Sequence, residues 1–378
     1  MYGQKSPKEM LIEILSGGSD SGAKNNKEYG IELDEMQLLS SVPDIYDCAD
    51  FSGPDPPIEH FLEPTVYTTL PLGREGKVLD IMQMAYNMVQ PGYTVIFTGK
   101  RRSGKTKVMR ALCRHLRRWY PEVVVFTRTK SSGEYARFLP DSRIIEGFDP
   151  DLLVTIAEIQ RDKVRKLSNG IGVDENINIL IILDDCLAER LQWSRELNAI
   201  FFEGRHLFIT LFVSIQDIKG CAPAATGNCD YAFLFPTGDE RTFEAVRDKY
   251  MPFLDKYELA DLLESDEINK KYHILGVDIA HKYNPIDRRI AFGCVDDERE
   301  EEDFVMGGPD MWKNDRRRLR ALGYEYLIGQ EDWGILKPSE FKTYVEQGCP
   351  LQPLRRGQVR RYSKAKSARN VVNSKKTK

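Results

Sequence analysis

The sequence lacks the features of a membrane-spanning, secreted or disulfide-stabilised protein. No stretch approaches about 18 consecutive apolar residues, which excludes a transmembrane helix. The first ten residues do not join a basic segment to an apolar core, so a secretory signal is not expected. The seven cysteines include no C-x-x-C pair, which argues against a disulfide framework or a zinc ribbon and fits a reducing compartment.

The sequence also lacks an internal repeat and a metal-binding pattern of histidines. The five histidines show none of the spacings of metal ligands, so a structural role is expected for each. With 41% hydrophobic and 30% charged residues, the composition is that of a soluble globular protein. A length of 378 residues allows one large domain with extensions or two modest ones.

Charge is distributed unevenly along the chain. Residues 355–378 contain ten Lys or Arg and no Asp or Glu, so this tail carries a charge of +10. Because the overall net charge is −4, the rest of the chain carries −14. We expect this basic tail to be disordered in isolation. Its composition leaves three interpretations open, namely nucleic-acid binding, a localisation signal and a docking tail. At the other end of the chain, turn-forming residues at 17–22 and 52–57 predict a poorly ordered N-terminal extension over 1–75.

Between these ends, short apolar runs alternate with helical patterns. This alternation predicts an α/β fold in which a mainly parallel sheet is buried on both faces. Asp149 and Pro150 form an expected helix start. The expected strands are 94–98, 123–127, 177–183, 207–215, 231–235, 273–278 and 289–295. The expected helices are 77–89, 105–119, 150–169, 187–202, 241–254, 257–263 and 316–320.

One motif carries recognisable chemistry. Residues 99–106, GKRRSGKT, match G-x-x-x-x-G-K-[ST] between an expected strand and an expected helix. In such a loop the backbone wraps around phosphates, the lysine contacts the β- and γ-phosphates, and the hydroxyl binds Mg²⁺. The predicted nucleotide-binding residues are Gly99, Lys100, Arg101, Arg102, Ser103, Gly104, Lys105 and Thr106.

A pair of carboxylates follows the strand expected at 177–183. We expect Asp184 to hold Mg²⁺ together with Thr106, and Asp185 to activate the attacking water. The alternative is that the two acids only cap the next helix. Gln216 follows the next expected strand, where it would sense the γ-phosphate or lie in a surface turn.

An arginine from a neighbouring copy could complete such a site. Arg205 is the favoured candidate, and Arg190, Arg195 and Arg241 are competitors. The sequence does not distinguish Arg205 from a surface arginine.

These motifs together resemble the genome-packaging ATPases of large eukaryotic DNA viruses, within the FtsK–HerA superfamily. The resemblance depends on four segments in order, namely TVIFTGKRRSGKT, INILIILDDC, GRHLFITLFVSIQD and NCDYAFLF, and covers about 90 to 300. Asp185 stands where bacterial relatives carry Glu. Thr226 and Gly227 stand where family members often carry an arginine.

The resemblance implies a RecA-like P-loop core, which we place at 76–300. The sequence after this core, which the resemblance does not cover, predicts a small helical extension at 301–354. The resemblance also implies hydrolysis of ATP with Mg²⁺ by a homo-oligomeric ring that translocates double-stranded DNA, without sequence specificity, into a capsid. Capsid or membrane-vertex proteins would be partners, and the protein would act in the virion and at assembly sites in the host cytoplasm.

Other classes of P-loop protein are weaker interpretations. A nucleoside or nucleotide kinase would need an acceptor site and an arginine-rich lid, and neither is evident. The intact acidic pair argues against a nucleotide switch that hardly hydrolyses ATP. A core of about 200 residues leaves no room for the second RecA-like domain of a helicase.

Overall fold

A computed structural model describes residues 12, 79–80, 84, 88, 92–186, 194–216, 227–235, 240–255, 257, 273–281, 289–294, 304–330 and 333–346. The predicted N-terminal extension, apart from Ile12, and the basic tail lie outside these residues. The predicted helix at 257–263, apart from Tyr257, also lies outside them.

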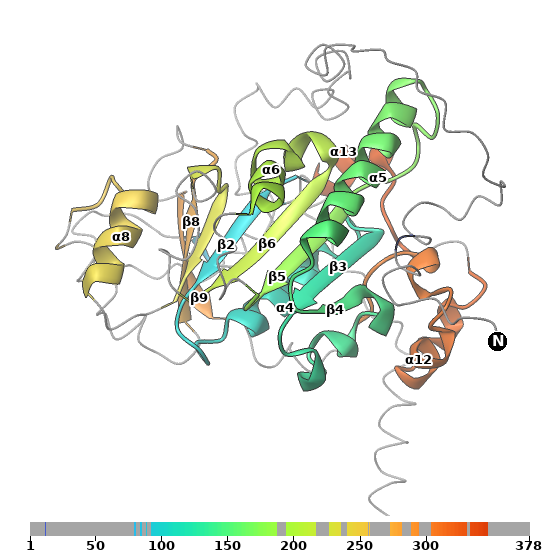
Figure 1. Cartoon of the computed structure of the whole chain (residues 1–378), viewed down its shortest axis with the longest axis horizontal. Helices are drawn as coiled ribbons and strands as arrows, with labels where there is room; N and C mark the ends of the chain where they lie inside the picture. Colours follow the sequence, from blue (N-terminus) through green and yellow to red (C-terminus); the bar gives the residue numbers. More distant parts are fainter. Residues whose placement is uncertain are drawn as a thin grey trace, which may run out of the picture.

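In the described part of the chain, a nine-stranded sheet forms the centre (Figure 1). Its spatial order is β1-β9-β8-β7-β2-β6-β5-β3-β4. Only β8 is antiparallel to its neighbours, so the sheet is mainly parallel, as predicted. The strands are β1 (Leu79–Asp80), β2 (Thr94–Thr98), β3 (Glu122–Thr127), β4 (Ile144–Glu146), β5 (Ile179–Asp184), β6 (Ile209–Ile215), β7 (Tyr231–Leu234), β8 (His273–Asp278) and β9 (Ile290–Cys294).

Helices cover both faces of this sheet (Figure 1). Successive residues of a strand point to opposite faces, so Val95 and Phe97 join the core on the α4 side while Ile96 joins the core under α5 and α6. The α-helices are α4 (Lys105–Leu116), α5 (Pro150–Ser168), α6 (Arg195–Glu203), α8 (Glu240–Tyr250), α12 (Arg316–Ala321) and α13 (Phe341–Glu346). This three-layer arrangement confirms the predicted α/β class.

The strand order explains how the two predicted motifs meet. β6 lies between β2, which precedes residues 99–106, and β5, which ends at Asp184. All three strands are parallel, so their carboxyl ends lie at one edge of the sheet. This arrangement confirms the predicted RecA-like P-loop core.

Several local predictions are also confirmed, and others are corrected. The Asp149 carboxylate accepts a hydrogen bond from the Leu152 N–H at 2.9 Å and so caps α5, as expected. The expected helix at 77–89 is wrong at Leu79–Asp80, because these residues pair with β9 as strand β1. The short strand β4 was not predicted, since three residues are too few for a recognisable apolar pattern.

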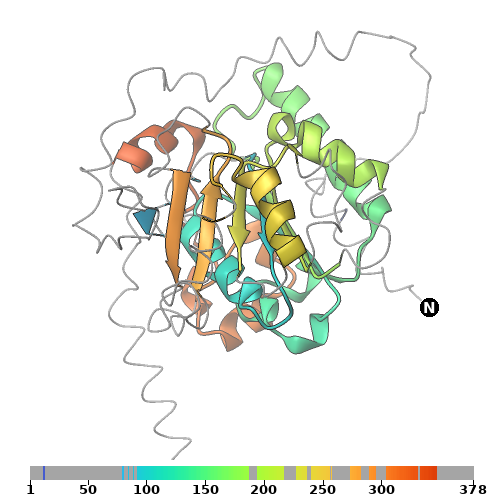
Figure 2. The same ribbon diagram turned by 90° about the vertical axis from the view of Figure 1, so that its left-hand side faces the viewer.

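The C-terminal part of the described chain returns to the core as short helical turns. Trp312 and Leu319 are buried there in the same cluster as Val108 and Leu112 of α4. Figure 2 shows β8 and β9, both orange, side by side towards one edge of the sheet. Within the described residues, no helix has the length and apolar character that crossing a membrane requires.

Candidate nucleotide-binding site

The P-loop motif lies at the carboxyl end of β2 and leads directly into α4. Gly104, the residue before α4, has φ 105° and ψ 8°, a left-handed conformation that suits glycine. Arg102 also has a positive φ, 62°, which is uncommon for a residue with a side chain and often marks a functional loop. The Ser103 hydroxyl is buried in this loop, and the described residues give it no hydrogen-bond partner.

Gly99 is required at its position by close packing. A β-carbon at Gly99 would lie 2.6 Å from the β-carbon of Phe235 and 3.0 Å from the Ser103 hydroxyl oxygen. Phe235 is almost fully buried, and its N–H donates to the Thr98 carbonyl at 3.0 Å. Because Phe235 is fixed next to β2, the loop itself would have to move.

We therefore expect Gly99→Ala to displace the loop. The added methyl group should lower the free energy of unfolding by about 1–3 kcal/mol, a typical effect of overpacking, and weaken ATP binding roughly tenfold. Thermal unfolding and titration with a fluorescent ATP analogue measure the two effects. Gly227→Ala is the matched control, since a β-carbon at Gly227 meets no atom within 4 Å. Equal behaviour of the two variants would contradict the packing argument.

Lys105 is held inside the loop. Its side chain is only 6% exposed. Its ammonium donates to the carbonyl oxygens of Gly99 at 2.6 Å and Lys100 at 2.9 Å. Burial lowers the pKa of this ammonium, while the nearby carboxylates of Asp185 and Asp184 oppose the shift. The P-loop thus places a desolvated cation beside two carboxylates.

Asp184 and Thr106 form the pair that was predicted for a metal. The Thr106 hydroxyl donates to Oδ2 of Asp184 at 3.2 Å, although 78 residues separate them in the sequence. Asp184 is 5% exposed. Burial raises the pKa of its carboxyl, and hydrogen bonds from the hydroxyls of Tyr135 and Thr106 oppose this shift.

Asp185 and Gln216 form a second pair beside the first. Asp185 adopts a left-handed conformation, with φ 54°, directly after β5. Oδ1 of its carboxylate accepts a hydrogen bond from the Gln216 amide at 3.1 Å. Gln216 follows Ile215, whose carbonyl accepts from the Gly99 N–H at 3.2 Å. The strand-tip rule therefore places Gln216 beside the start of the P-loop.

Tyr135 joins this site without any warning from the sequence. Its buried hydroxyl donates to the same Oδ2 atom of Asp184 at 2.9 Å. Tyr135 lies in η3 (Tyr135–Arg137), within a segment for which the sequence predicted no regular element. No motif connects it to Asp184, 49 positions further along the chain.

The remaining predicted residues are exposed. Lys100, Arg101 and Arg102 are exposed on the P-loop. Arg205 is exposed in η6 (Gly204–Leu207), and its Cα lies 3.0 Å from where a β-carbon of Gly92 would be. Gly92 precedes β2, so Arg205 lies at the opposite end of that strand from the P-loop, roughly 15 Å or more away.

The surroundings of Arg205 are acidic. Burial raises the pKa of the neighbouring Asp230 carboxyl to about 6, and the positive charge of Arg205 opposes this shift. The Asp230 carboxylate accepts from the Thr94 N–H at 2.7 Å, at the amino end of β2. Within one copy of the chain, Arg205 therefore belongs to a different surface from Lys105.

Comparisons with known proteins relate these residues to viral proteins. An uncharacterised protein of Acanthamoeba polyphaga mimivirus is 27% identical over 161 residues, 41% of this chain and 56% of that protein. An uncharacterised protein of Invertebrate iridescent virus 3 is 26% identical over 188 residues, 49% of this chain and 69% of that protein. The chain thus spans little more than half the length of the mimivirus relative.

A solved structure is also similar, at low identity. It is the genome packaging NTPase B204 of Sulfolobus turreted icosahedral virus 2 in complex with AMPPCP, 14% identical with a TM-score of 0.40. The similarity covers 55% of this chain and 100% of that one. A family model described as "Poxvirus A32 protein" matches residues 83–249. The matched residues hold the P-loop, the acidic pair and Gln216, so the match confirms for this core the resemblance to the poxvirus type of packaging ATPase.

Proposed function

We propose that this chain is an ATPase that uses ATP hydrolysis to translocate double-stranded DNA during the packaging of a viral genome into a capsid. The observation that carries the proposal is the meeting of two motifs at one edge of the sheet. The Thr106 hydroxyl of the P-loop contacts Asp184 at the end of β5, and the Asp185–Gln216 pair lies beside them. The match of residues 83–249 to the poxvirus family supports the packaging role.

The P-loop would bind the phosphates of ATP. In this proposal the β- and γ-phosphate oxygens replace the carbonyls of Gly99 and Lys100 as acceptors of the Lys105 ammonium. A buried ammonium needs hydrogen-bond acceptors both without ATP and with ATP bound, because leaving a desolvated charge unpaired costs free energy. The N–H groups at the start of α4 favour anions for the same electrostatic reason.

The donor set at Thr106 and Asp184 fits Mg²⁺. A hydroxyl and a carboxylate oxygen lie 3.2 Å apart, and Mg²⁺ prefers such oxygen ligands, completed by phosphate and water. Among the described residues no cluster of three or more His, Cys, Asp or Glu could hold a metal alone. When bound with ATP, the ion would neutralise charge on the phosphates.

The second pair would act on water. Asp185 is more exposed than Asp184 and accepts from the Gln216 amide. We assign Asp185 to accept the proton of the attacking water, and Gln216 to orient the Asp185 carboxylate and sense the γ-phosphate. The two carboxylates thus have different tasks because they have different surroundings.

Arg205 could contribute only to a second copy. It lies at the opposite end of β2 from the P-loop of its own chain, so contact with a γ-phosphate requires a neighbouring subunit. A ring of identical copies would provide that contact and would surround DNA. In the same proposal, capsid or membrane-vertex proteins anchor the ring in the virion and at assembly sites in the host cytoplasm.

The first test is the dependence of ATP hydrolysis on DNA. We expect long double-stranded DNA to stimulate the steady-state rate of the full chain severalfold, without sequence preference. Raising the salt concentration from about 50 to about 200 mM should weaken the apparent DNA affinity at least about tenfold, because phosphate contacts release counterions. An ATPase that ignores DNA and salt would contradict a motor. Hydrolysis that responds instead to nucleosides would favour a kinase.

A further inference from the structure

The Thr106–Asp184 pair, the part of the candidate site where the metal would bind, is connected to α12, a short helix in the C-terminal part of the chain. The connection runs through η3, the turn that carries Tyr135. One end of this turn reaches Asp184 through the Tyr135 hydroxyl. The next residue of the turn, Ala136, is bound by Arg318 of α12, which lies 182 residues away in the sequence.

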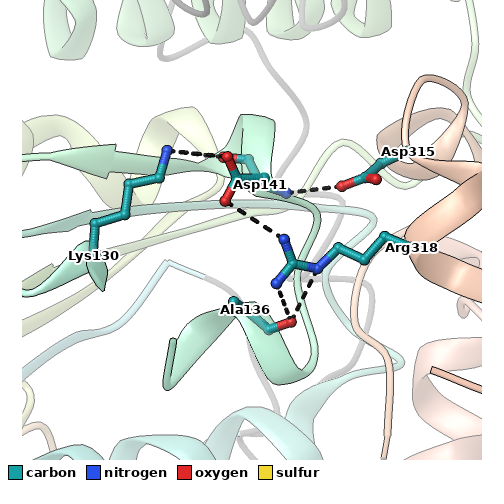
Figure 3. Close-up of polar contacts among 5 residues, drawn as sticks. All are labelled: Lys130, Ala136, Asp141, Asp315 and Arg318. Carbon is teal, nitrogen blue, oxygen red and sulfur yellow. Dashed lines mark hydrogen bonds and ion pairs between the residues drawn. The ribbon is translucent and has the colours of Figure 1, made fainter. Parts of the chain in front are cut away.

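The contact between Arg318 and η3 is specific. Its guanidinium donates from Nη2 at 2.6 Å and from Nε at 3.2 Å to one oxygen, the carbonyl of Ala136 (Figure 3). Ala136 follows Tyr135 directly, so the arginine fixes the backbone that carries the tyrosine. A planar guanidinium with two donors on one acceptor defines a position more narrowly than a lysine could.

Asp141 forms additional ion pairs with Arg318 and Lys130. Its carboxylate lies 3.5 Å from Arg318 Nη1 and 3.4 Å from Lys130 Nζ, and its N–H donates to Asp315 at 3.0 Å (Figure 3). The Asp141 side chain is 60% exposed, so these ion pairs are screened by solvent and add little alone. The donation from Arg318 to the Ala136 carbonyl is the contact that matters.

Aromatic packing holds the same turn against the C-terminal segment. Phe138 stacks on Phe304 with ring centroids 4.7 Å apart, and its carbonyl accepts from the Met306 N–H at 3.1 Å. Tyr135 packs against Phe138 at a centroid distance of 6.0 Å. The segment 304–318 therefore contacts the turn and the residue after it at several points.

We propose that Tyr135 is a positioning residue that aims the Asp184 carboxylate at the metal, and that α12 sets Tyr135 through the contact of Arg318 with Ala136. The inference rests on the proposed ATPase function. Tyr135 and Thr106 donate to the same oxygen of Asp184, so together they fix the orientation of the carboxylate. We call the connection from Arg318 through Ala136 and Tyr135 to Asp184 the relay. Through it, a change at α12, such as contact with a partner, would alter the orientation of the Asp184 carboxylate.

The test compares binding of a fluorescent ATP analogue with and without MgCl₂. In the full chain we expect Tyr135→Phe to reduce the Mg²⁺-dependent gain in affinity three- to tenfold and to leave metal-free binding unchanged. Tyr120→Phe is the matched control, because it loses a buried tyrosine bond of 2.9 Å to Thr210 at a distance from Asp184. An equal Mg²⁺ gain in these two variants would overturn the proposal.

The role of α12 is tested with a second pair of variants. Arg318→Gln should reduce the Mg²⁺ gain about two- to fivefold, whereas Arg317→Gln, at an exposed neighbour on the same helix, should not. If both residues act in one relay, the double variant with Tyr135→Phe should lose no more than Tyr135→Phe alone. Fully additive losses would overturn the link to α12, and thermal unfolding identifies any loss of fold.

These outcomes separate the relay from the proposed function. A native protein that binds the nucleotide but does not respond to Mg²⁺ would overturn the relay while leaving nucleotide binding established. A native protein that binds no nucleotide would overturn both. Normal Mg²⁺ behaviour together with hydrolysis indifferent to DNA would contradict the motor and leave the relay intact.

Discussion

Replacing Lys105 with alanine should strongly weaken ATP binding and abolish ATP hydrolysis. The variant removes a buried ammonium that would form charge-assisted hydrogen bonds with the phosphates of ATP. Truncating one partner of such a buried pair costs about 2–5 kcal/mol, so the Kd for ATP should rise roughly 30-fold to several thousandfold. Isothermal titration with a nonhydrolysable ATP analogue measures this effect directly, and steady-state hydrolysis should fall to background.

The fold of the Lys105→Ala variant should survive. In the free protein the ammonium contacts only the carbonyls of Gly99 and Lys100 among the hydrogen bonds described for it. The variant loses these two hydrogen bonds, but it also avoids the free-energy cost of burying the ammonium, so the effects on stability offset each other. Lys313→Ala, at an exposed lysine, is the control for charge loss alone. Unchanged ATP affinity in Lys105→Ala would refute the assignment of the P-loop.

Replacing Asp185 with asparagine should separate binding from chemistry. The amide oxygen of asparagine can still accept from Gln216, so the geometry of the 3.1 Å hydrogen bond is preserved. The variant cannot accept a proton from water, and loss of a general base slows a reaction by about 10²–10⁴-fold. Nucleotide affinity should stay within about threefold of the native value, because Lys105 and Asp184 remain.

Single-turnover hydrolysis, measured beside equilibrium binding, checks this prediction. Asp174→Asn removes an exposed carboxylate from the loop before β5 and serves as the control. Native rates in Asp185→Asn would remove Asp185 from the reaction. Loss of nucleotide binding in Asp185→Asn would instead show that the Asp185 carboxylate takes part in binding, a role that we assign to Lys105 and Asp184.

The outline of the fold was predictable because parallel strands buried on both faces are almost wholly apolar. The runs at Thr94–Thr98 and His273–Asp278 coincide with β2 and β8. The direction of β8 was not predictable, since strand polarity depends on connections that composition does not encode. The first expected helix was wrong at its start because pairing with β9, far along the chain, overrides local periodicity.

The site was predictable where contacts follow a motif. Lys105, Thr106 and Asp184 meet because a P-loop and a strand-tip acid lie at one edge of a parallel sheet. Tyr135 and Arg318 were not predictable, because their roles depend on a short turn and on a contact across 182 positions. The place of Arg205 at the far end of β2 is given by its close approach to Gly92.

The sheet ends in two very short strands. β1 has two residues and β4 has three, and these are the two edges of the nine-stranded order. Long exposed edge strands are templates for aggregation, and natural proteins often shorten them. Many copies of this chain could therefore crowd together at high local concentration with little tendency to fuse their sheets into fibrils. Association between copies would then depend on side-chain surfaces, which can separate and re-form, rather than on continuous backbone pairing.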